Sequence, residues 1–495
     1  MSERVVAAYR WRWVALAALL LAEAMNLLDS TIVQVATPAI RADLGGSAAD
    51  MQWFSTAYTL PFALLLITGG RLGDIAGRRR VFRIGVTGFL GASVACALAP
   101  SVGMLIGFRV VQGAAAAAVI PQTIGLIRAM FDGEESDGEE SDGEEMSKAL
   151  GSIGPVMGLA AVCGPVLGGV LTHADLFGSS WRAAFLVNVP LSAAVLAVAP
   201  TLIEDHAPAR PSLDPIGTAL AMLGTALIVY PLIGADTAHL PMGTWGAIGL
   251  GLAVIAGFGL HQRRSAGLGR SSLVETSLFA HRAFPAALVT STLFFAVTTG
   301  LMFVVVLHLQ LGLGTDVRTA GLTMVPWSVG LAVSSWVAGA YLVPRHGRRV
   351  MFAGLATLAI GVLAAVAVYH AAGSTGYPTP LLGALGVAGL GVGMFTPSFF
   401  TTALKPLRPQ EIGSAAGLLN AVQQLGATLG VAVLGSVYFD GARSDSPGSA
   451  VQVTFWVAGG LLVASFLSTV LMTTVNPRLQ DHPSGSKEAL LDLDS

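Results

Sequence analysis

Long apolar stretches recur along the whole chain and are separated by short polar segments. A helix needs about 20 mostly apolar residues to cross a bilayer. Fourteen segments meet that length, near residues 13–35, 51–70, 82–100, 103–128, 149–171, 183–203, 213–234, 242–261, 286–310, 319–343, 351–371, 380–403, 411–437 and 453–475. The first carries two acidic residues and lacks a small-residue cleavage site, so it is expected to remain as a span and not to be a cleaved signal peptide. The pattern predicts an all-α polytopic membrane protein.

Basic residues are distributed unevenly between the two sides that these spans define. With a cytoplasmic N-terminus, 22 Lys and Arg residues fall in cytoplasmic segments and four on the other side, while Arg109 lies within a span. Cytoplasmic loops of membrane proteins carry such an excess of Lys and Arg. The bias therefore favours an even number of spans with both termini in the cytoplasm, and we expect a multi-pass protein of the bacterial cytoplasmic membrane.

The two halves of the chain repeat each other. Gly77-Arg78-Arg79 after the second span matches Gly347-Arg348-Arg349 after the tenth, and Pro121 matches Pro397 in the corresponding later span. Internal duplication of this kind is typical of transporters. It predicts two six-helix bundles, residues 1–203 and 266–476, with two inserted transmembrane helices in residues 204–265. A polar tail, residues 477–495, is expected to be disordered.

Composition narrows the class of protein. The chain is 54% hydrophobic and 11% charged, with a mean hydropathy of +0.71, whereas soluble proteins carry about 25% charged residues. No phosphate-binding loop, metal-ligand cluster or nucleophile elbow is found, so an enzyme, a cofactor and a bound metal are not expected. Basic runs interleaved with aromatic residues are also lacking, which argues against nucleic-acid binding.

An acidic block interrupts this apolar chain. Residues 132–146 repeat the pattern Asp-Gly-Glu-Glu and contain nine acids, so the rest of the chain has a net charge of +7 although the whole has −2. Like charges at this density repel one another and disfavour packing. We expect a solvated loop between the fourth and fifth spans; weak divalent-cation binding is an alternative, although the spacing is not that of an EF-hand.

Three ionisable residues fall well inside predicted spans: Glu23, Asp29 and Arg109. Such residues are costly in a bilayer and usually functional. At about 1.5 Å per residue, Glu23 lies near the midplane, and Asp29 and Arg109 lie at similar depth in the outer third. The last two could pair directly or through water. A movement that changed this contact would change the proton affinity of Asp29; the alternative is a static ion pair that fixes the packing of two helices.

A polar stripe extends from Glu23 along the first span. Asn26 and Ser30 share its helix face, and Gln34 continues the stripe toward the outer end. These four residues are candidates for the lining of a substrate cavity, and Glu23 could attract a cationic substrate or carry a second proton. The stripe could also simply bond to a neighbouring helix. His308 and His370 fall near outer ends of spans, where an interfacial position is expected for both.

Glycine dominates one face of the fifth span. Gly158, Gly164, Gly168 and Gly169 leave a stripe without side chains, against which another helix can pack closely. Pro165 removes one backbone hydrogen bond and favours a bend. A bilayer tolerates this only where protein or water satisfies the freed carbonyl, so we expect this helix to line a pathway.

Several motifs resemble those of the fourteen-span drug–proton antiporters of the major facilitator superfamily. The resembling segments are Leu28–Pro38, Gly70–Arg80, Arg109–Gly113, Gly164–Gly169, Trp181–Pro190 and Leu213–Gly217. The resemblance covers roughly residues 13 to 475. It implies the major facilitator fold and a proton-coupled antiporter that exports small amphiphilic drugs or antibiotics, cations among them, by alternating access, without a cofactor. A monomer in the lipid bilayer is expected.

The resemblance also assigns roles to residues. Asp29 would be the coupling carboxylate and Arg109 its modulator, with Glu23 as a further candidate. A cytoplasmic latch would consist of Gly70, Gly73, Asp74, Gly77, Arg78, Arg79 and Arg80, although the arginines could serve as topological anchors alone. Gly158, Gly164, Pro165, Gly168 and Gly169 would form the interface about which the halves rock.

The sequence departs from the family pattern at two positions. Pro344 stands in the second loop copy where the first has Asp74, and Gln423 stands where relatives often carry arginine. A symmetric latch is therefore not expected. Two rival functions stay open: an uptake or metabolite permease on the same fold, and a receptor or scaffold that does not transport.

Overall fold

Within the residues that the structure describes, fourteen helices are long and apolar enough to cross a membrane, which is the number predicted. They are seen in a computed structural model that describes residues 11–131, 148–149, 151–203, 213–233, 242–268, 273–280, 282–372, 377–444 and 446–474, where no strand occurs. The predicted acidic loop and polar tail lie outside the described residues. The fold is thus all-α, as the hydrophobic pattern indicates.

The first six spans contain most of the polar network described below. They are formed by α2 (Arg12–Leu44), α3 (Ala48–Ala76), α4 (Arg78–Ala97), α5 (Val102–Phe131) and α7 (Ile153–Ala174), and by a sixth span made of η2 (Ser180–Arg182), α8 (Ala183–Leu186), α9 (Asn188–Val198) and η3 (Ala199–Thr201). We call α2 to α9 the N half. The first helix extends well past residue 35, where the sequence pattern placed its end.

Two further helices follow, and then six more spans. The insert consists of α10 (Pro215–Val229), which η4 (Tyr230–Leu232) extends, and α11 (Met242–Gly267), and a short η5 (Thr276–Phe279) follows it. The C half consists of α12 (Ala283–Leu307) with the π-helix η6 (His308–Gly312), α13 (Val317–Thr323), α14 (Val325–Val337) with the π-helix η7 (Ala338–Leu342), α15 (Val343–His346), α16 (Arg348–Ala372), α17 (Leu381–Leu404), α18 (Pro409–Ser444) and α19 (Pro447–Thr473).

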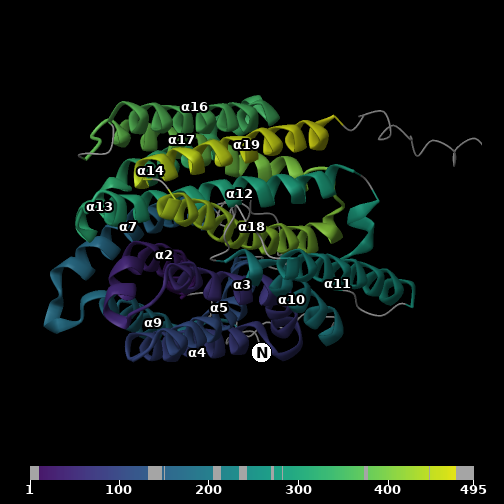
Figure 1. Ribbon diagram of the computed structural model, residues 1–495. Coiled ribbons are helices and arrows are strands. Elements are labelled where there is room, and N and C mark those ends of the chain that lie inside the picture. Colours follow the sequence, from purple (N-terminus) through teal and green to yellow (C-terminus); the bar gives the residue numbers. More distant parts are fainter. Residues whose placement is uncertain are drawn as a thin grey trace, which may run out of the picture.

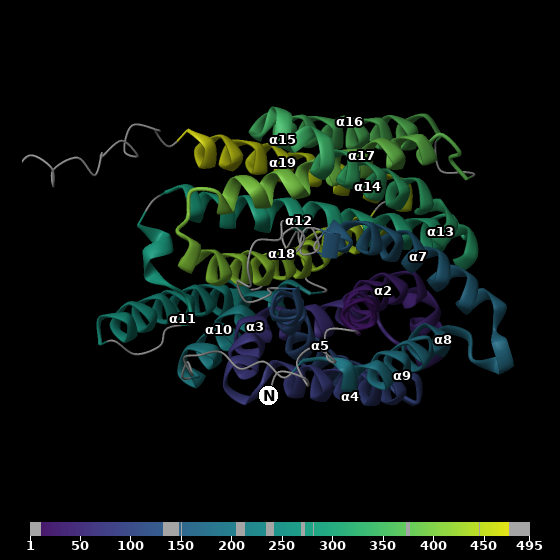
Figure 2. The ribbon, with the colours of Figure 1, turned by 180° about the vertical axis from the view of Figure 1, so that it is seen from behind.

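The halves lie against each other as two layers of helices (Figure 1). Contacts between them are made mainly by α3 with α18 and by α7 with α13 and α14. The view from behind shows α7 reaching up from the N half to lie beside α13 (Figure 2). The insert lies at one side, where α10 contacts both α3 and α18.

Helix caps repeat between the halves. Gly45, with φ of 72°, ends α2, and Gly314, with φ of 65°, follows the η6 segment after α12. Ser47 then caps α3 through Asp50, and Asp316 caps α13 by accepting from the Thr319 amide. Both pairs are 269 residues apart in the sequence. Because left-handed backbone favours glycine and a capping oxygen satisfies free amides, the repeated caps give the two halves the same helix ends.

The tenth span is less regular than its N-half counterpart. Where α3 is one continuous helix, the later copy is divided into α13, α14, the π-helix η7 and the four-residue α15. Pro344 is the second residue of α15, just after η7, and cannot donate a hydrogen bond to the preceding turn. A π-turn accommodates such a missing bond, so the substitution of Asp74 by proline also explains the local change in the helix.

Candidate functional site

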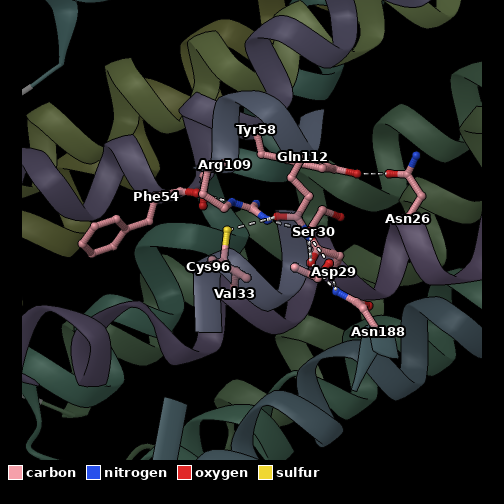
Figure 3. A network of polar contacts seen from close by, with 12 residues as sticks. Asn26, Asp29, Ser30, Val33, Phe54, Tyr58, Cys96, Arg109, Gln112 and Asn188 are labelled. Carbon is pink, nitrogen blue, oxygen red and sulfur yellow. Dashed lines mark hydrogen bonds and ion pairs between the residues drawn. The ribbon is translucent and has the colours of Figure 1, made fainter. Parts of the chain in front are cut away.

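Asp29 lies inside a buried polar network that joins α2, α3, α4, α5 and α9 of the N half (Figure 3). Its carboxylate accepts hydrogen bonds from Arg109 Nη1 on α5, from Gln112 Nε2 at 2.8 Å, and from Asn188 Nδ2 on α9 at 2.7 Å. Asp29 and Arg109 are both wholly buried and form a direct ion pair. Of the two contacts that the sequence left open, direct or through water, the structure has the direct one.

Arg109 is held from several sides as well. Its Nε donates to the Phe54 carbonyl of α3 at 3.0 Å, and Nη1 also donates to Gln112 Oε1 at 2.8 Å. The guanidinium lies 4.3 Å from the centre of the Tyr58 ring, a cation–π contact. A buried charge of this kind is tolerated only when it is paired and hydrogen-bonded. The ion pair therefore fixes α2, α3 and α5 relative to one another in this conformation.

Gln112, Asn188 and Ser93 complete the network, and the sequence analysis did not name them as site residues. Ser93 Oγ on α4 accepts from Gln112 at 2.9 Å and from Asn188 at 3.3 Å. All three side chains are fully buried. Their signal in the sequence was present, because each is a polar residue within a largely apolar span, and two lie within segments used for the family resemblance.

The network leaves two polar atoms unsatisfied. Arg109 Nη2 and Asn188 Oδ1 are buried and have no hydrogen-bond partner among the described residues. An unmade hydrogen bond on a buried group costs about 1–3 kcal/mol. Both atoms belong to side chains that also bond to Asp29, so each can still take up one further hydrogen bond.

The four residues of the polar stripe on α2 have different contacts. Asn26 Oδ1 accepts a hydrogen bond from the Tyr58 hydroxyl, and Ser30 bonds back to the Leu27 carbonyl of its own helix at 2.8 Å. The Oε1 atom of Gln34 is buried without a partner among the described residues. Glu23 is 8% exposed and makes no hydrogen bond or ion pair within the described part of the chain. Tyr58 thus links the stripe to Arg109, while Glu23 lies apart.

The glycine face of α7 contacts both halves. A Cβ atom on Gly168 would lie 2.9 Å from the Ile32 carbonyl of α2, and one on Gly164 would overlap the Thr31 side chain. A Cβ on Gly169 would lie 2.9 Å from the Val317 carbonyl of α13. Gly164 and Gly168 therefore allow α2 to pack closely against α7, and Gly169 allows α13 to do so. Helix α7 thus lies between α2 and the C half.

Two other residues of that motif also lie toward the C half. The Pro165 carbonyl lies against Gly321 of α13, which leaves no space for a side chain there. A Cβ on Gly158 would lie 3.0 Å from the Ala332 side chain of α14. The motif is thus a close-packed contact along much of the boundary between the halves, as the glycine stripe predicted.

The latch segment packs against α5. A side chain on Gly73 would overlap Gln122, one on Gly69 would overlap the Ala117 carbonyl, and a Cβ on Gly70 would lie 3.4 Å from Pro121. Gly77, with φ of 92°, separates α3 from α4, and its repeat Gly347 has φ of 53°. Both positions need glycine because other residues rarely adopt this backbone region.

One ion pair lies within the latch itself. Asp74 accepts from Arg78 at 3.0 Å within the segment. Arg79 is half-buried and Arg80 is exposed. Asp74 therefore engages an arginine of the same segment. The same end of the molecule is where the insert meets the N half.

Asp214 connects the two inserted helices at that end. It caps α10 through the Gly217 amide at 2.8 Å, and it accepts from Gln262 at 2.8 Å and contacts His261 at 3.0 Å on α11. Burial would raise the pKa of the Asp214 carboxyl, but the Gly217 amide, His261 and Gln262 together hold the pKa below its usual range. The segment Leu213–Gly217 thus caps α10 and, through Asp214, holds α10 against α11.

Glu275 lies between the insert and the C half. Burial raises the pKa of its carboxyl, nearby Glu411 of α18 raises it further, and Arg71 of the latch opposes both. The side-chain amide oxygen of Gln262 accepts a hydrogen bond from the Val274 backbone at 3.3 Å. The linker after the insert is therefore tied electrostatically and by hydrogen bonding to the latch end of the molecule.

One expectation about histidine was wrong. His308 was expected at the membrane interface, but it is only 1% exposed and lies among aromatic rings of the C half. His308 continues the helix face of the buried Leu301, Val304 and Val305, so regular helical spacing directs its side chain inward, whereas its place near the end of a span suggested the interface. His370 is exposed at the end of α16, as expected.

Comparison with known proteins identifies the family. The sequence profile described as Major Facilitator Superfamily matches residues 19–431, with a second match over residues 287–494. The chain belongs to the major facilitator superfamily. Membership confirms the prediction of a multi-pass membrane transporter, not an enzyme, and the described residues hold no group of three potential metal ligands.

The relatives are antibiotic and multidrug efflux proteins. A probable actinorhodin transporter of Streptomyces coelicolor is 43% identical over 434 residues, which cover 87% of this chain and 73% of that protein. A puromycin resistance protein of Streptomyces alboniger is 32% identical, with 94% of this chain and 90% of that protein covered. A tetracenomycin C resistance and export protein of Streptomyces glaucescens is 31% identical, with 86% and 75% covered.

Solved structures agree on the fold. An auto-inhibited peptide transporter of the POT family matches with a TM-score of 0.66 over 93% of this chain and 97% of that chain, at 14% identity. At this identity the likeness concerns the fold alone. Helix arrangement is therefore that of the superfamily, and the chemistry must be argued from the residues of this chain.

Proposed function

We propose that this protein exports small amphiphilic compounds, antibiotics among them, in exchange for protons. The observation that carries the proposal is the buried Asp29, which three donors from α5 and α9 hold in a network joining the helices of one half. Its efflux relatives support the direction of transport and the small-molecule substrate. A carboxylate held in this way releases its proton in one conformation and binds it in another, once the donors move away.

Two side-chain hydrogen bonds between α3 and α18 lie toward one end of the molecule. Gln52 of α3 donates to Ser436 of α18 at 3.3 Å, and Thr59 bonds to Thr428 at 2.7 Å. All four residues lie toward the end where α2 meets α3, opposite the latch. With the latch in the cytoplasm, as the basic residues indicate, this is the external end. The conformation is then one in which the external end is closed.

Alternating access follows from these contacts. Rocking about the glycine face of α7 would separate α3 from α18 at the external end and bring the latch toward α18. The same movement would shift α2 against α5 and α9, because Gly164 and Gly168 tie α7 to α2. Asp29 would then lose donors and meet external water, where it would take up a proton.

The substrate path is proposed to follow the polar stripe of α2. Glu23 lies apart from the coupling network and has no partner within the described residues, so it can attract a cationic or hydrogen-bonding compound. Protons and the substrate are the only ligands required, and the protein is proposed to act as a monomer with both termini in the cytoplasm of a bacterium.

The test is transport in proteoliposomes with an imposed pH gradient. Wild-type protein should move a fluorescent amphiphilic cation against its gradient, with substrate-dependent proton flux in the opposite direction. Asp29→Asn should reduce both to the level of empty liposomes while the purified yield is unchanged. Full proton-coupled transport by that variant would refute Asp29 as the coupling group, and uptake in the direction of proton flow would favour the permease alternative.

A further inference from the structure

His308 occupies a closed aromatic cage in the C half, far along the chain from the coupling network. Its ring meets Tyr369 of α16 edge-on at 5.1 Å between centroids and Tyr438 of α18 at 6.0 Å. The Tyr438 hydroxyl lies 3.4 Å from His308 Nδ1. His308 is 1% exposed and Tyr369 is 4% exposed. This is a titratable group that the proposed coupling reaction does not use.

The backbone around His308 is built to seat the ring. His308 begins a π-turn that ends at Gly312, and a side chain on Gly312 would lie 2.6 Å from His308 Nδ1. Pro447 at the start of α19 closes the other side of Gly312 at 3.2 Å. π-turns in membrane helices occur frequently at functional sites. The turn and its glycine thus provide a space of the size of one imidazole.

Within the part of the chain that the structure describes, no charged side chain contacts the His308 ring. The titratable groups that face it are Tyr438 on α18 and Tyr369 on α16, and Tyr377, which bonds to Thr323 of α13 at 2.8 Å, lies near Tyr369. The residues that α19 contributes here are not titratable: Pro447 lies beside Gly312, and Phe455 lies beside Tyr369. No carboxylate among the described residues contacts the imidazole. Burying an imidazolium here would be costly, so the closed cage accepts only the neutral ring.

The same π-turn also carries a contact between the halves. Gln310, two residues after His308, donates to the Val35 carbonyl of α2 at 2.9 Å. Val35 follows Asp29 by six residues on the same helix. The contact lies at the external end, together with the α3–α18 contacts. Closing the external end therefore fixes the position of the π-turn, and with it the neutral His308 ring in its cage.

We propose that His308 is a second proton-binding site, which is protonated only when the external end is open. A proton on His308 opposes the closed cage, because the charged ring needs water that the cage excludes. Proton binding therefore shifts the population toward the outward-open conformation. This deepens the proposed export cycle and rests on its orientation, since external acid would then hold the pump open while Asp29 is loaded.

The test is a distance measurement across the external end, which needs no transport. Spin labels are placed through Ala42→Cys on α2 and Arg443→Cys on α18, two exposed positions, with Cys163→Ala and buried Cys96 retained. The background carries Asp29→Asn, so the coupling carboxylate cannot contribute. Between pH 8 and pH 5 the ratio of open to closed distances should rise by up to about tenfold per pH unit, the limit for one linked proton.

Variants of His308 decide the outcome. His308→Gln and His308→Phe should each abolish this pH response, and two different replacements guard against misfolding of one. His370→Gln, a histidine exposed at the end of α16, is the matched control and should respond like the parent. A response retained in both His308 variants, or missing in the parent, would overturn the proposal. Failure of proton-coupled export in proteoliposomes would not alter this readout, so the two proposals can fail separately.

Discussion

The two halves share helix ends but differ in what they bury. The N half places an ion pair with amide and hydroxyl partners between its helices. The C half instead stacks aromatic rings: the ring centroid of Phe395 lies 3.8 Å from that of Phe294 and 5.3 Å from that of Phe399. The repeated caps align α2 with α12 at 269 residues, which places Thr298 at the position of Asp29.

The partner of Asp29 has also been replaced in the C half. Pro121 and Pro397 align α5 with α17 at 276 residues, which places Leu385 at the position of Arg109. Leu385 lines a small apolar cavity together with Met302 and Trp327. The difference teaches that the fold does not need a charge pair here, because the other copy of the same arrangement is held by apolar packing.

The largest expected effect comes from giving the N half the C-half residues. Arg109→Leu alone leaves Asp29 buried without its counter-ion and should destabilise the protein by about 3–5 kcal/mol. The double variant Asp29→Thr with Arg109→Leu should recover most of that loss, because it removes the uncompensated charge, but should not transport. Thermal unfolding in detergent and proton-coupled transport measure the two effects.

The control for this exchange lies in the C half. Thr298→Val removes a hydroxyl whose bond to the Phe295 carbonyl is long, at 3.4 Å, so stability should change by about 1 kcal/mol or less and transport should persist. If the double variant were as unstable as Arg109→Leu alone, the network would be a structural requirement of the N half, and the comparison with the C half would fail.

Asn188 offers a finer test of the same network. Asn188→Leu removes one of the donors to Asp29 and the bond to Ser93. A hydrogen bond to a charged group contributes about 1.5–3 kcal/mol. The variant should hold the ionised Asp29 less well, so the pH dependence of transport should move to higher pH by about one unit or more, at 1.36 kcal/mol per unit.

Ser192→Ala on the same helix is a suitable control for Asn188→Leu. Ser192 is also buried, but its hydroxyl contacts Met25 and not Asp29. Its replacement should leave the pH profile in place. A profile that is unchanged in Asn188→Leu, with normal rates, would mean that Gln112 and Arg109 suffice to set the proton affinity of Asp29.

Much of this arrangement could be predicted from the sequence. Periodic apolar stretches gave all fourteen spans, because a bilayer imposes one length on every helix, and similar depth placed Asp29 beside Arg109. Gln112 and Asn188 were missed because depth does not tell which face of a helix meets which neighbour. His308 was misplaced for a different reason: its position near the end of a span suggested the interface, although it shares the buried helix face of Leu301, Val304 and Val305.

The glycines after the two loop copies test how far the repeat extends. Gly77→Ala and Gly347→Ala each force a side chain into a backbone region that other residues rarely adopt, with φ of 92° and 53°. Each should cost about 1–3 kcal/mol in unfolding free energy. Gly77→Ala should also impair transport, because Asp74 and Arg78 pair across this turn, whereas Pro344 replaces that acid in the C half. Equal transport losses in both variants would contradict an asymmetric latch.

The smallest expected effect concerns the insert, which has no counterpart in the repeat. Asp214→Ala removes the cap of α10 and the clamp to α11, and a lost cap costs about 1 kcal/mol. Because the pKa of Asp214 is lowered in the folded protein, its ionised form stabilises the fold at neutral pH. This contribution is complete above the unfolded pKa of about 3.9 and is lost as the pH falls through the lower folded value. The stability difference between wild type and Asp214→Ala, measured by thermal unfolding, should therefore persist from pH 8 to pH 5 and shrink only below about pH 4. A difference that already vanished near pH 6 would mean that the ionised Asp214 carboxylate does not stabilise the clamp.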